Sequence, residues 1–167
     1  MHYLYVKHQC AEPVITNDFL SGCDICWFRP GLFRLFKKPE KFQLKTALSR
    51  LYFWVITGGR YQIVYLMDGE QIVHTAFVVP SCSKFPFLGK ADYEIGPCVT
   101  AEQYRGRGAY RYVLETITAN KELAGENFYM IVRNTNAASI KGIENAGFQR
   151  CGSVSRTGFL RNYKKEK

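Results

Sequence analysis

Residues 93–117 read YEIGPCVTAEQYRGRGAYRYVLETI, and this stretch decides the fold. Its first part is rich in β-favouring side chains and is interrupted by a Gly-Pro pair, which predicts a strand over 91–100. A turn follows at 103–108, and from Ala109 onward apolar residues recur at helical spacing. The stretch therefore predicts a strand, a glycine-bearing loop and a helix in direct succession.

The loop has the chemistry of an anion-binding site. The first turn of a helix carries amide N–H groups without partners and the positive end of the helix dipole. Gly106 and Gly108 lack a Cβ, so a ligand can approach these amides closely, and Arg105 and Arg107 add positive charge. We therefore expect a phosphate or pyrophosphate here. The loop matches neither the nucleoside-triphosphate motif G-x-x-x-x-G-K-[ST] nor the dinucleotide fingerprint G-x-G-x-x-G.

What residues 103–108, QYRGRG, do resemble is the pyrophosphate loop Q/R-x-x-G-x-G/A of the GNAT superfamily of coenzyme-A-dependent N-acetyltransferases. A second stretch, NAASIKGIENAGF at 136–148, resembles the GNAT pattern N-x-x-A-x-x-x-Y-x-x-x-G-F. Ser139 replaces the usual alanine, and Ile143 stands where the family usually has tyrosine. Together the two motifs cover residues 91–150, which the resemblance marks as the acetyl-CoA-binding core.

The resemblance implies a single domain over residues 1–167 with an α/β (α+β) GNAT fold. A mixed, mostly antiparallel sheet of six or seven strands would be flanked by about four helices. The sheet would splay between its fourth and fifth strands, at 91–100 and 127–133, and helices within 11–58 would lie on the acceptor side.

Local patterns predict the remaining elements. Asp68-Gly69 is a strong hairpin signal between two apolar strands, and Gly58-Gly59 should end the helix that precedes them. The predicted order is strand 3–6, short helices within 11–38, helix 39–55, strands 61–67, 71–79 and 91–100, helix from 109, strand 127–133, helix 136–146, and strands 148–154 and 159–163.

Gly96-Pro97 lies inside a predicted core strand. Proline donates no ladder hydrogen bond, so the pair marks either a harmless kink or a place where the strand leaves its neighbour. The GNAT resemblance favours divergence, which would leave backbone groups free to pair with a pantetheine arm. The residues expected to bind the cofactor are Cys98, Val99, Thr100, Gln103, Arg105, Gly106, Arg107, Gly108, Ala109, Asn136 and Ser139.

Acetyl transfer to an amine requires a base, a donor for the oxyanion and a proton for the leaving thiolate. Asp92 and Glu94 point to one face of their strand, and either carboxylate could serve as base or form a surface ion pair. Glu94 lies nearer the expected acetyl position. A backbone N–H at 98–100 would bind the oxyanion, and transfer would be direct rather than through Cys98. Ser139 could supply the proton, or the thiolate could leave without one.

These features lead to two functional hypotheses. The first is an N-acetyltransferase that moves an acetyl or other acyl group from acetyl-CoA to a primary amine of a small molecule. An amino sugar or a nucleotide-linked amino sugar would suit a basic protein rich in aromatic residues, and an amino-acid or peptide amine is the alternative. The second is a weakened GNAT-fold module that binds coenzyme A, nucleic acid or a protein without turnover.

The formal net charge of +9 requires anionic partners, and coenzyme A explains part of it. We do not expect nucleic acid as a partner. The aromatic and basic segment 27–38 could pack on the core, form a wall of the acceptor pocket or contact an acidic membrane surface. The sequence fits a monomer or a homodimer.

The six cysteines bear on metal binding, and the N-terminal residues HYLYVKHQ bear on the compartment. Cys23 and Cys26 form a C-x-x-C with His8 and Cys10 upstream, so a zinc site is an alternative to plain reduced thiols. A second such pair is missing, and no metal is expected. The chain has neither an apolar signal core nor a long apolar run, so we expect a cytoplasmic protein.

Overall fold

The computed structural model describes residues 1–9, 18–123, 125–157 and 162–166. A single eight-stranded sheet runs through it in the order β2-β3-β4-β5-β6-β1-β7-β8. Its elements are β1 (His2–His8), α1 (Asp18–Ser21), β2 (Asp24–Phe28), α2 (Leu44–Thr57), β3 (Gln62–Asp68), β4 (Gln71–Pro80), β5 (Tyr93–Thr100), α3 (Ala109–Ala119), β6 (Asn127–Arg133), α4 (Ala137–Asn145), β7 (Gln149–Thr157) and β8 (Asn162–Lys165), with 3₁₀ turns at Glu102–Tyr104 and Lys121–Leu123. The predicted mixed, mostly antiparallel sheet is confirmed.

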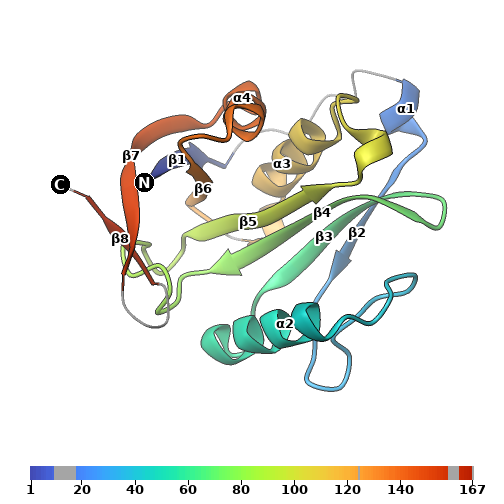
Figure 1. Ribbon diagram of the computed structural model, residues 1–167, viewed down its shortest axis with the longest axis horizontal. Coiled ribbons are helices and arrows are strands. Elements are labelled where there is room, and N and C mark those ends of the chain that lie inside the picture. Colours follow the sequence, from blue (N-terminus) through green and yellow to red (C-terminus); the bar gives the residue numbers. More distant parts are fainter. Residues whose placement is uncertain (10–17, 124, 158–161, 167) are drawn as a thin grey trace.

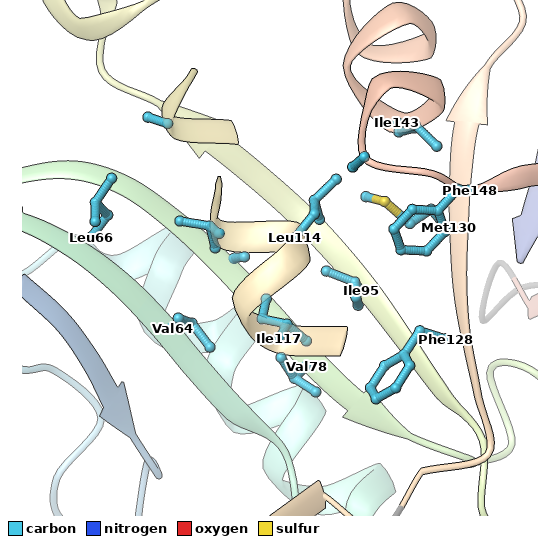
Figure 2. Packing of buried hydrophobic residues seen from close by; sticks show 14 of the residues in the cluster. Val64, Leu66, Val78, Ile95, Leu114, Ile117, Phe128, Met130, Ile143 and Phe148 are labelled. Atoms are coloured by element: carbon cyan, nitrogen blue, oxygen red, sulfur yellow. The ribbon is translucent and has the colours of Figure 1, made fainter. Parts of the chain in front are cut away.

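Helices cover both faces of the sheet. Helices α3 and α4 lie on one face and α2 on the other (Figure 1). On the first face, Leu114 and Ile117 of α3 pack onto Val78 and Ile95 of the central strands (Figure 2). On the α2 face a second core gathers around Phe53 and the inner strands. The inner strands β3 and β4 therefore have buried residues on both faces, which fixes their register.

The splay predicted in the sheet is present. Strands β5 and β6 are the parallel pair, and their ladder consists of Tyr93 with Phe128 and Glu94 with Tyr129. Beyond Glu94 the two strands separate, whereas β5 keeps pairing with β4 on its other side up to Thr100. The edge of β5 that faces the gap is therefore without a β6 partner from Ile95 onward.

Two predictions for the N-terminal half need correction. The short helices expected within 11–38 are wrong in part, because Asp24–Phe28 forms strand β2 at the edge of the sheet. The sheet consequently has eight strands rather than six or seven. Helix α2 begins at Leu44 rather than Pro39, and Gly58 ends it in the left-handed conformation, as predicted. Residues 10–17 and 158–161, which include part of two predicted elements, lie outside the described residues.

The first strand lies between two strands that follow it by more than a hundred residues. β1 pairs antiparallel with both β6 and β7. His2 thereby stands opposite Arg133 on one side and Val154 on the other. Nothing in the local pattern of residues 3–6 specifies these neighbours, because they depend on pairing across the chain.

A buried ion pair anchors the segment before α2. Arg50 is 2% exposed, and its guanidinium donates to both carboxylate oxygens of Glu40 and to the Leu35 carbonyl, with Nη1 2.8 Å from Glu40 Oε2. Tyr65 of β3 donates its hydroxyl to the same carboxylate at 2.9 Å.

No helix in the described part of the chain is long and apolar enough to cross a membrane.

Candidate active site

Two cavities meet at the splay. The loop cavity, about 670 Å³, lies between β5, the start of α3 and α4, and the sheet cavity, about 410 Å³, extends from the gap between β5 and β6 toward α2. Cys98, Tyr110 and Ser139 line both. A ligand that filled the loop cavity would therefore present one end to the sheet cavity.

Backbone conformation opens the mouth of the loop cavity. Gly108 caps α3 with φ +81°, and its carbonyl accepts the first helical hydrogen bond, from the Tyr112 N–H at 3.0 Å. Gly106 has φ +76°, and a Cβ placed there would meet nothing within 4 Å. Only glycine adopts both conformations without strain, and the amides around them stay accessible. This is the geometry expected of an anion-binding loop.

Three cations line the loop cavity: Arg105, Arg111 and Lys141. The sequence reading identified the first of them alone. Arg107 lines neither cavity in the described structure, because its guanidinium stacks over Phe19 at 5.1 Å and Tyr104 at 5.8 Å. Gln103, in the 3₁₀ turn, is exposed and also lines neither. Arg111 and Lys141 were not predicted from the sequence, because neither occupies a fixed position of the two GNAT motifs.

The free edge of β5 borders both cavities. Cys98 lines both, while Val99 and Thr100 line the loop cavity, and Val99 is 62% exposed although it belongs to a central strand. Ala109 forms part of the same wall. An unpaired strand edge with an exposed apolar residue is suited to an extended ligand that adds as a further strand.

His74 of β4 lies beneath this edge and was given no role from sequence. Its Nδ1 is 2.7 Å from Thr100 Oγ1, and its ring lies 5.5 Å from that of Tyr110. Burial lowers the pKa of His74 to about 4, so the imidazole is neutral at pH 7. Its buried Nε2 has no partner among the described residues. His74 therefore offers the loop cavity one neutral ring nitrogen.

Glu94 is the buried acid of the sheet cavity. It is 6% exposed, and its Oε2 has no hydrogen-bond partner in the described part of the chain. Burial raises the pKa of Glu94 to about 8, with Lys84 opposing the shift. A Cβ at position 96 would lie 2.8 Å from Glu94 Oε1, so Gly96 leaves room for the carboxylate. The group can exchange a proton near neutral pH.

Asp92, the other predicted carboxylate, is placed differently. Its Oδ2 accepts from the Gly89 N–H at 2.7 Å and its Oδ1 from Asn127 Nδ2 at 2.8 Å. It lines neither cavity among the residues described. The structure brings Glu94 to the splay but uses Asp92 to tie the loop before β5 to β6.

Helix α4 contributes Asn136, Ser139 and Ile143 to the sheet cavity. Asn136 caps the helix, accepting from the Ser139 N–H at 3.2 Å. Ile143 is 1% exposed and has no proton to give.

The hydroxyl that sequence reasoning missed belongs to Tyr110, the second residue of α3, which lines both cavities. Burial raises the pKa of Tyr110, as do Cys98 and Glu94, so its hydroxyl remains protonated.

The cysteines that the structure describes do not form a recognisable metal centre. Among the described residues, which exclude Cys10, no three His, Cys, Asp or Glu side chains lie close enough to hold a metal ion. Cys23 donates its thiol to the Phe19 carbonyl at 3.3 Å. Burial and the neighbouring Glu94 raise the pKa of Cys98, which disfavours its thiolate.

Comparison with known proteins supports the fold. The structure matches a GNAT-family acetyltransferase from Colwellia psychrerythraea with a TM-score of 0.57 and 14% identity, covering 90% of this chain and 52% of that one. It matches a GCN5-related N-acetyltransferase from Sphaerobacter thermophilus with a TM-score of 0.58 and 15% identity, covering 90% and 48%. This chain therefore spans about half the length of these two proteins.

A third match, an assigned GNAT-family acetyltransferase from Desulfovibrio desulfuricans, has a comparable length. Its TM-score is 0.54 at 16% identity, and the match covers 85% of this chain and 95% of that one. No family model matches the sequence. No curated protein matches it either. The expected GNAT fold is thus confirmed on structural likeness at low sequence identity.

Proposed function

We propose that this chain, which has the fold of the GNAT acetyltransferases, transfers an acyl group from an acyl-coenzyme A directly to a primary amine. The observation that carries the proposal is the junction at Cys98, Tyr110 and Ser139, where a glycine-lined anion cavity opens into a second cavity containing the buried acid Glu94. Neither cavity alone distinguishes an acyltransferase from other phosphate-binding proteins.

The residues present fit coenzyme A. The accessible amides around Gly106 and Gly108 suit a pyrophosphate, and Arg105, Arg111 and Lys141 supply matching charge. The unpaired edge of β5 at 98–100 suits the amides of the pantetheine arm. Acetyl-CoA would supply a thioester carbonyl as the electrophile. The backbone N–H groups of this edge are the candidates to stabilise its oxygen during attack.

Glu94 is the proposed general base. It lies on the α2 face of β5, whereas its neighbour Ile95 packs on the α3 face, so an amine entering the sheet cavity would reach Glu94 from the side opposite the anion loop. A base with a pKa near the working pH is suited to accept the amine proton as the C–N bond forms. Asp92 is left out, since both its carboxylate oxygens are engaged.

Tyr110 is the proposed proton donor to the sulfur as the C–S bond breaks. The residue lines both cavities at their junction. Ser139, at the same junction, is the alternative donor. The presence of Tyr110 offsets the tyrosine missing at Ile143, and so favours an enzyme over a module that only binds coenzyme A.

The acceptor is proposed only as a primary amine of a small molecule. An amino sugar remains one candidate among several, and the wall of the sheet cavity near Ser49 and Phe53 of α2 is where it would be selected. The aromatic and basic segment 27–38 lies outside that wall, because none of its residues is among those that line either cavity.

The test is release of free thiol from acetyl-CoA against a panel of primary amines, with coenzyme A affinity measured separately by titration calorimetry. We expect turnover with at least one acceptor, abolished by Gly108→Trp because the indole would fill the loop cavity. Gly58→Trp is the matched control: Gly58 is, like Gly108, a helix-cap glycine with positive φ. A Cβ at Gly58 would meet nothing within 4 Å, and Gly58 lines neither cavity.

Three other results would contradict the proposal. Coenzyme A binding without turnover over a broad panel would indicate a sensor. Salt-sensitive binding of nucleic acid without affinity for coenzyme A would point to a different function of the basic surface. No heat with coenzyme A from well-folded protein would remove the basis for acyl transfer altogether.

A further inference from the structure

The rim of the sheet cavity carries an excess of positive charge. Lys84, Arg133 and Arg156 line it together with His2, and Glu94 is the one acidic residue among the described residues of its wall. These side chains come from four separate segments of the chain, so their convergence is a property of the fold and not of a local basic run.

Among the described residues the three cations are not held in direct ion pairs, although Lys84 is near enough to Glu94 to oppose the rise in its pKa. In the described part of the chain, none of Lys84, Arg133 and Arg156 forms an ion pair with a carboxylate. By contrast, the buried Arg50 is fully paired with Glu40. Lys84 instead lies over aromatic rings, 4.6 Å from the centroid of Phe53. Cations held this way keep their charge available to a ligand.

Strand pairing fixes the positions of His2, Arg133 and Arg156. His2 and Arg133 are directly opposite each other in the β1–β6 ladder, and His2 is opposite Val154 in the β1–β7 ladder. Arg156 lies two residues beyond Val154 and so points to the same face. Its guanidinium is held by the Tyr163 hydroxyl, at 2.9 Å from Nε and 2.7 Å from Nη2. Strands therefore fix Arg133 and Arg156, whereas Lys84 lies in the turn between β4 and β5.

The sheet cavity has two parts that favour ligand groups of opposite charge: the positive rim favours an anion, and the region of the buried acid favours an amine. Glu94 lies at the splay, beside the junction with the loop cavity, and suits the amine. A cleft lined by charges of one sign concentrates ligands of the other sign. Because Glu94 is 6% exposed and mostly protonated at neutral pH, it does not cancel the field of the three cations.

We infer that the acceptor is an amine that also carries an anionic group, a carboxylate or a phosphate, bound by Lys84, Arg133 and Arg156 while its amine faces Glu94. This inference rests on the proposed acyl transfer and narrows its substrate class. Simple polyamines are unfavourable acceptors on this account, because a second cation would face the rim.

The experiment compares amines that differ only in the anion. Tyramine is paired with tyrosine for the carboxylate arm, and glucosamine with glucosamine 6-phosphate for the phosphate arm. We expect the anionic member of at least one pair to have a kcat/KM about tenfold higher or more at low ionic strength, and the advantage to shrink with salt. The arm that responds identifies the anion. If tyramine and glucosamine are both turned over as well as or better than their anionic counterparts, the inference is wrong. The proposed acyl transfer would be unaffected by that result.

Variants locate the effect. Arg133→Gln and Lys84→Met should each reduce the preference for the anionic member several-fold. The preference is the ratio of the kcat/KM values of the two members on the same protein, so a change that affects both members equally, such as one caused by the loss of Lys84 near Glu94, cancels. Lys121→Gln is the matched control, since Lys121 is exposed and lines neither cavity. Should Lys121→Gln reduce the preference as much as Arg133→Gln, the effect would come from the overall charge and the rim assignment would be wrong.

Binding provides a readout that does not depend on turnover. Tyrosine and glucosamine 6-phosphate are titrated into protein saturated with coenzyme A, and wild type is compared with Arg133→Gln. Heat from at least one of them, weakened by the substitution, is the expected result. If coenzyme A binds but neither anionic amine gives any heat, the inference fails regardless of the proposed function, whereas failure to bind coenzyme A at all contradicts the proposed function instead.

Discussion

The ring of Tyr110 occupies the space beside Gly142 that any larger residue would fill with its side chain. A Cβ built at Gly142 would lie 2.5 Å from Tyr110 Cδ1 and 2.8 Å from Cε1. Gly142 belongs to α4 and Tyr110 to α3, so this contact sets how the two helices meet at the junction of the cavities. The position of the tyrosine hydroxyl therefore depends on a glycine in a neighbouring helix.

Removing that hydroxyl should slow transfer without weakening cofactor binding. We expect Tyr110→Phe to lower kcat by about 10²-fold, the lower range of general acid catalysis, with little change in the affinity for coenzyme A. Steady-state thiol release and titration calorimetry measure the two quantities. Tyr112→Phe, on the same helix but outside both cavities, is the control. An unchanged kcat in Tyr110→Phe would mean that the thiolate leaves without this donor.

The effect of alanine at position 142 should depend on the tyrosine. Glycine inside a helix normally costs about 0.5–1 kcal/mol relative to alanine, so Gly142→Ala would stabilise an uncrowded helix. Here we expect it to destabilise the wild-type background, because the ring must move, and to stabilise the Tyr110→Ala background. Urea unfolding of the four variants measures this coupling. Equal effects in both backgrounds would show that the ring yields without cost.

Local chemistry predicted the parts of the site that depend on the backbone. The accessible loop follows from the missing Cβ of Gly106 and Gly108, which the structure places at positive φ. The separation of the strands after Glu94 was implied by the GNAT resemblance, because Gly96-Pro97 alone also allowed a harmless kink. Long-range packing decided the rest.

Four features could not be predicted in this way. The neighbours of β1 depend on pairing with strands far along the chain. Asp92 and Glu94 are equivalent by alternation, and the hydrogen bonds that Asp92 accepts from Gly89 and Asn127 distinguish them. The role suggested for Tyr110 depends on the space left by Gly142, which no spacing in the sequence reveals. Strand β2 was missed because its five residues lie among turn-forming residues.

Activity should rise with pH through the titration of Glu94. Burial raises the pKa of this carboxyl to about 8, and only the ionised form accepts a proton, so the base is inactive below that pH and active above it. The acceptor amine also loses a proton in this range, so the wild-type profile of kcat/KM is compared with that of Glu94→Gln on the same acceptor. We expect kcat/KM of the variant to be about 10²-fold lower than that of wild type. The rise in kcat/KM near pH 8 should also be absent from the variant. Superimposable profiles would exclude Glu94 as the base.

The same carboxyl should make folding stability depend on pH in the opposite direction from most acids. Its pKa in the folded state, about 8, is above the ordinary value of 4.5, so its contribution to stability is fully present below 4.5 and is lost as the pH rises through 8. Glu94→Gln stays neutral throughout. When the pH is raised from 5 to 9, we expect the free energy of unfolding of the variant to increase by at least about 1 kcal/mol relative to that of wild type. Parallel urea-unfolding curves at the two values would contradict the burial of an ionisable group there.

The pair of Arg50 and Glu40 should dominate the stability of the α2 side. Arg50→Ala leaves the Glu40 carboxylate without its main partner, 13% exposed, and removal of one partner of a buried pair costs about 3–5 kcal/mol. Arg50→Met with Glu40→Gln removes both charges and should cost less than the two single substitutions added together. Denaturant unfolding of the cycle measures the coupling, and additive effects would show that the pair contributes nothing beyond its separate contacts.

Acid should weaken this pair in a predictable direction. Burial alone would raise the pKa of Glu40, but hydrogen bonds from Arg50 and from the Lys37 backbone outweigh it and lower the pKa below its ordinary value of 4.5. The stability that the pair contributes is therefore present above pH 4.5 and is lost as the pH falls through the lowered pKa. We expect wild type to lose more stability than Arg50→Met/Glu40→Gln between pH 6 and pH 3. Equal losses would mean that other carboxyls govern acid unfolding, since the variant has no charge left at either position.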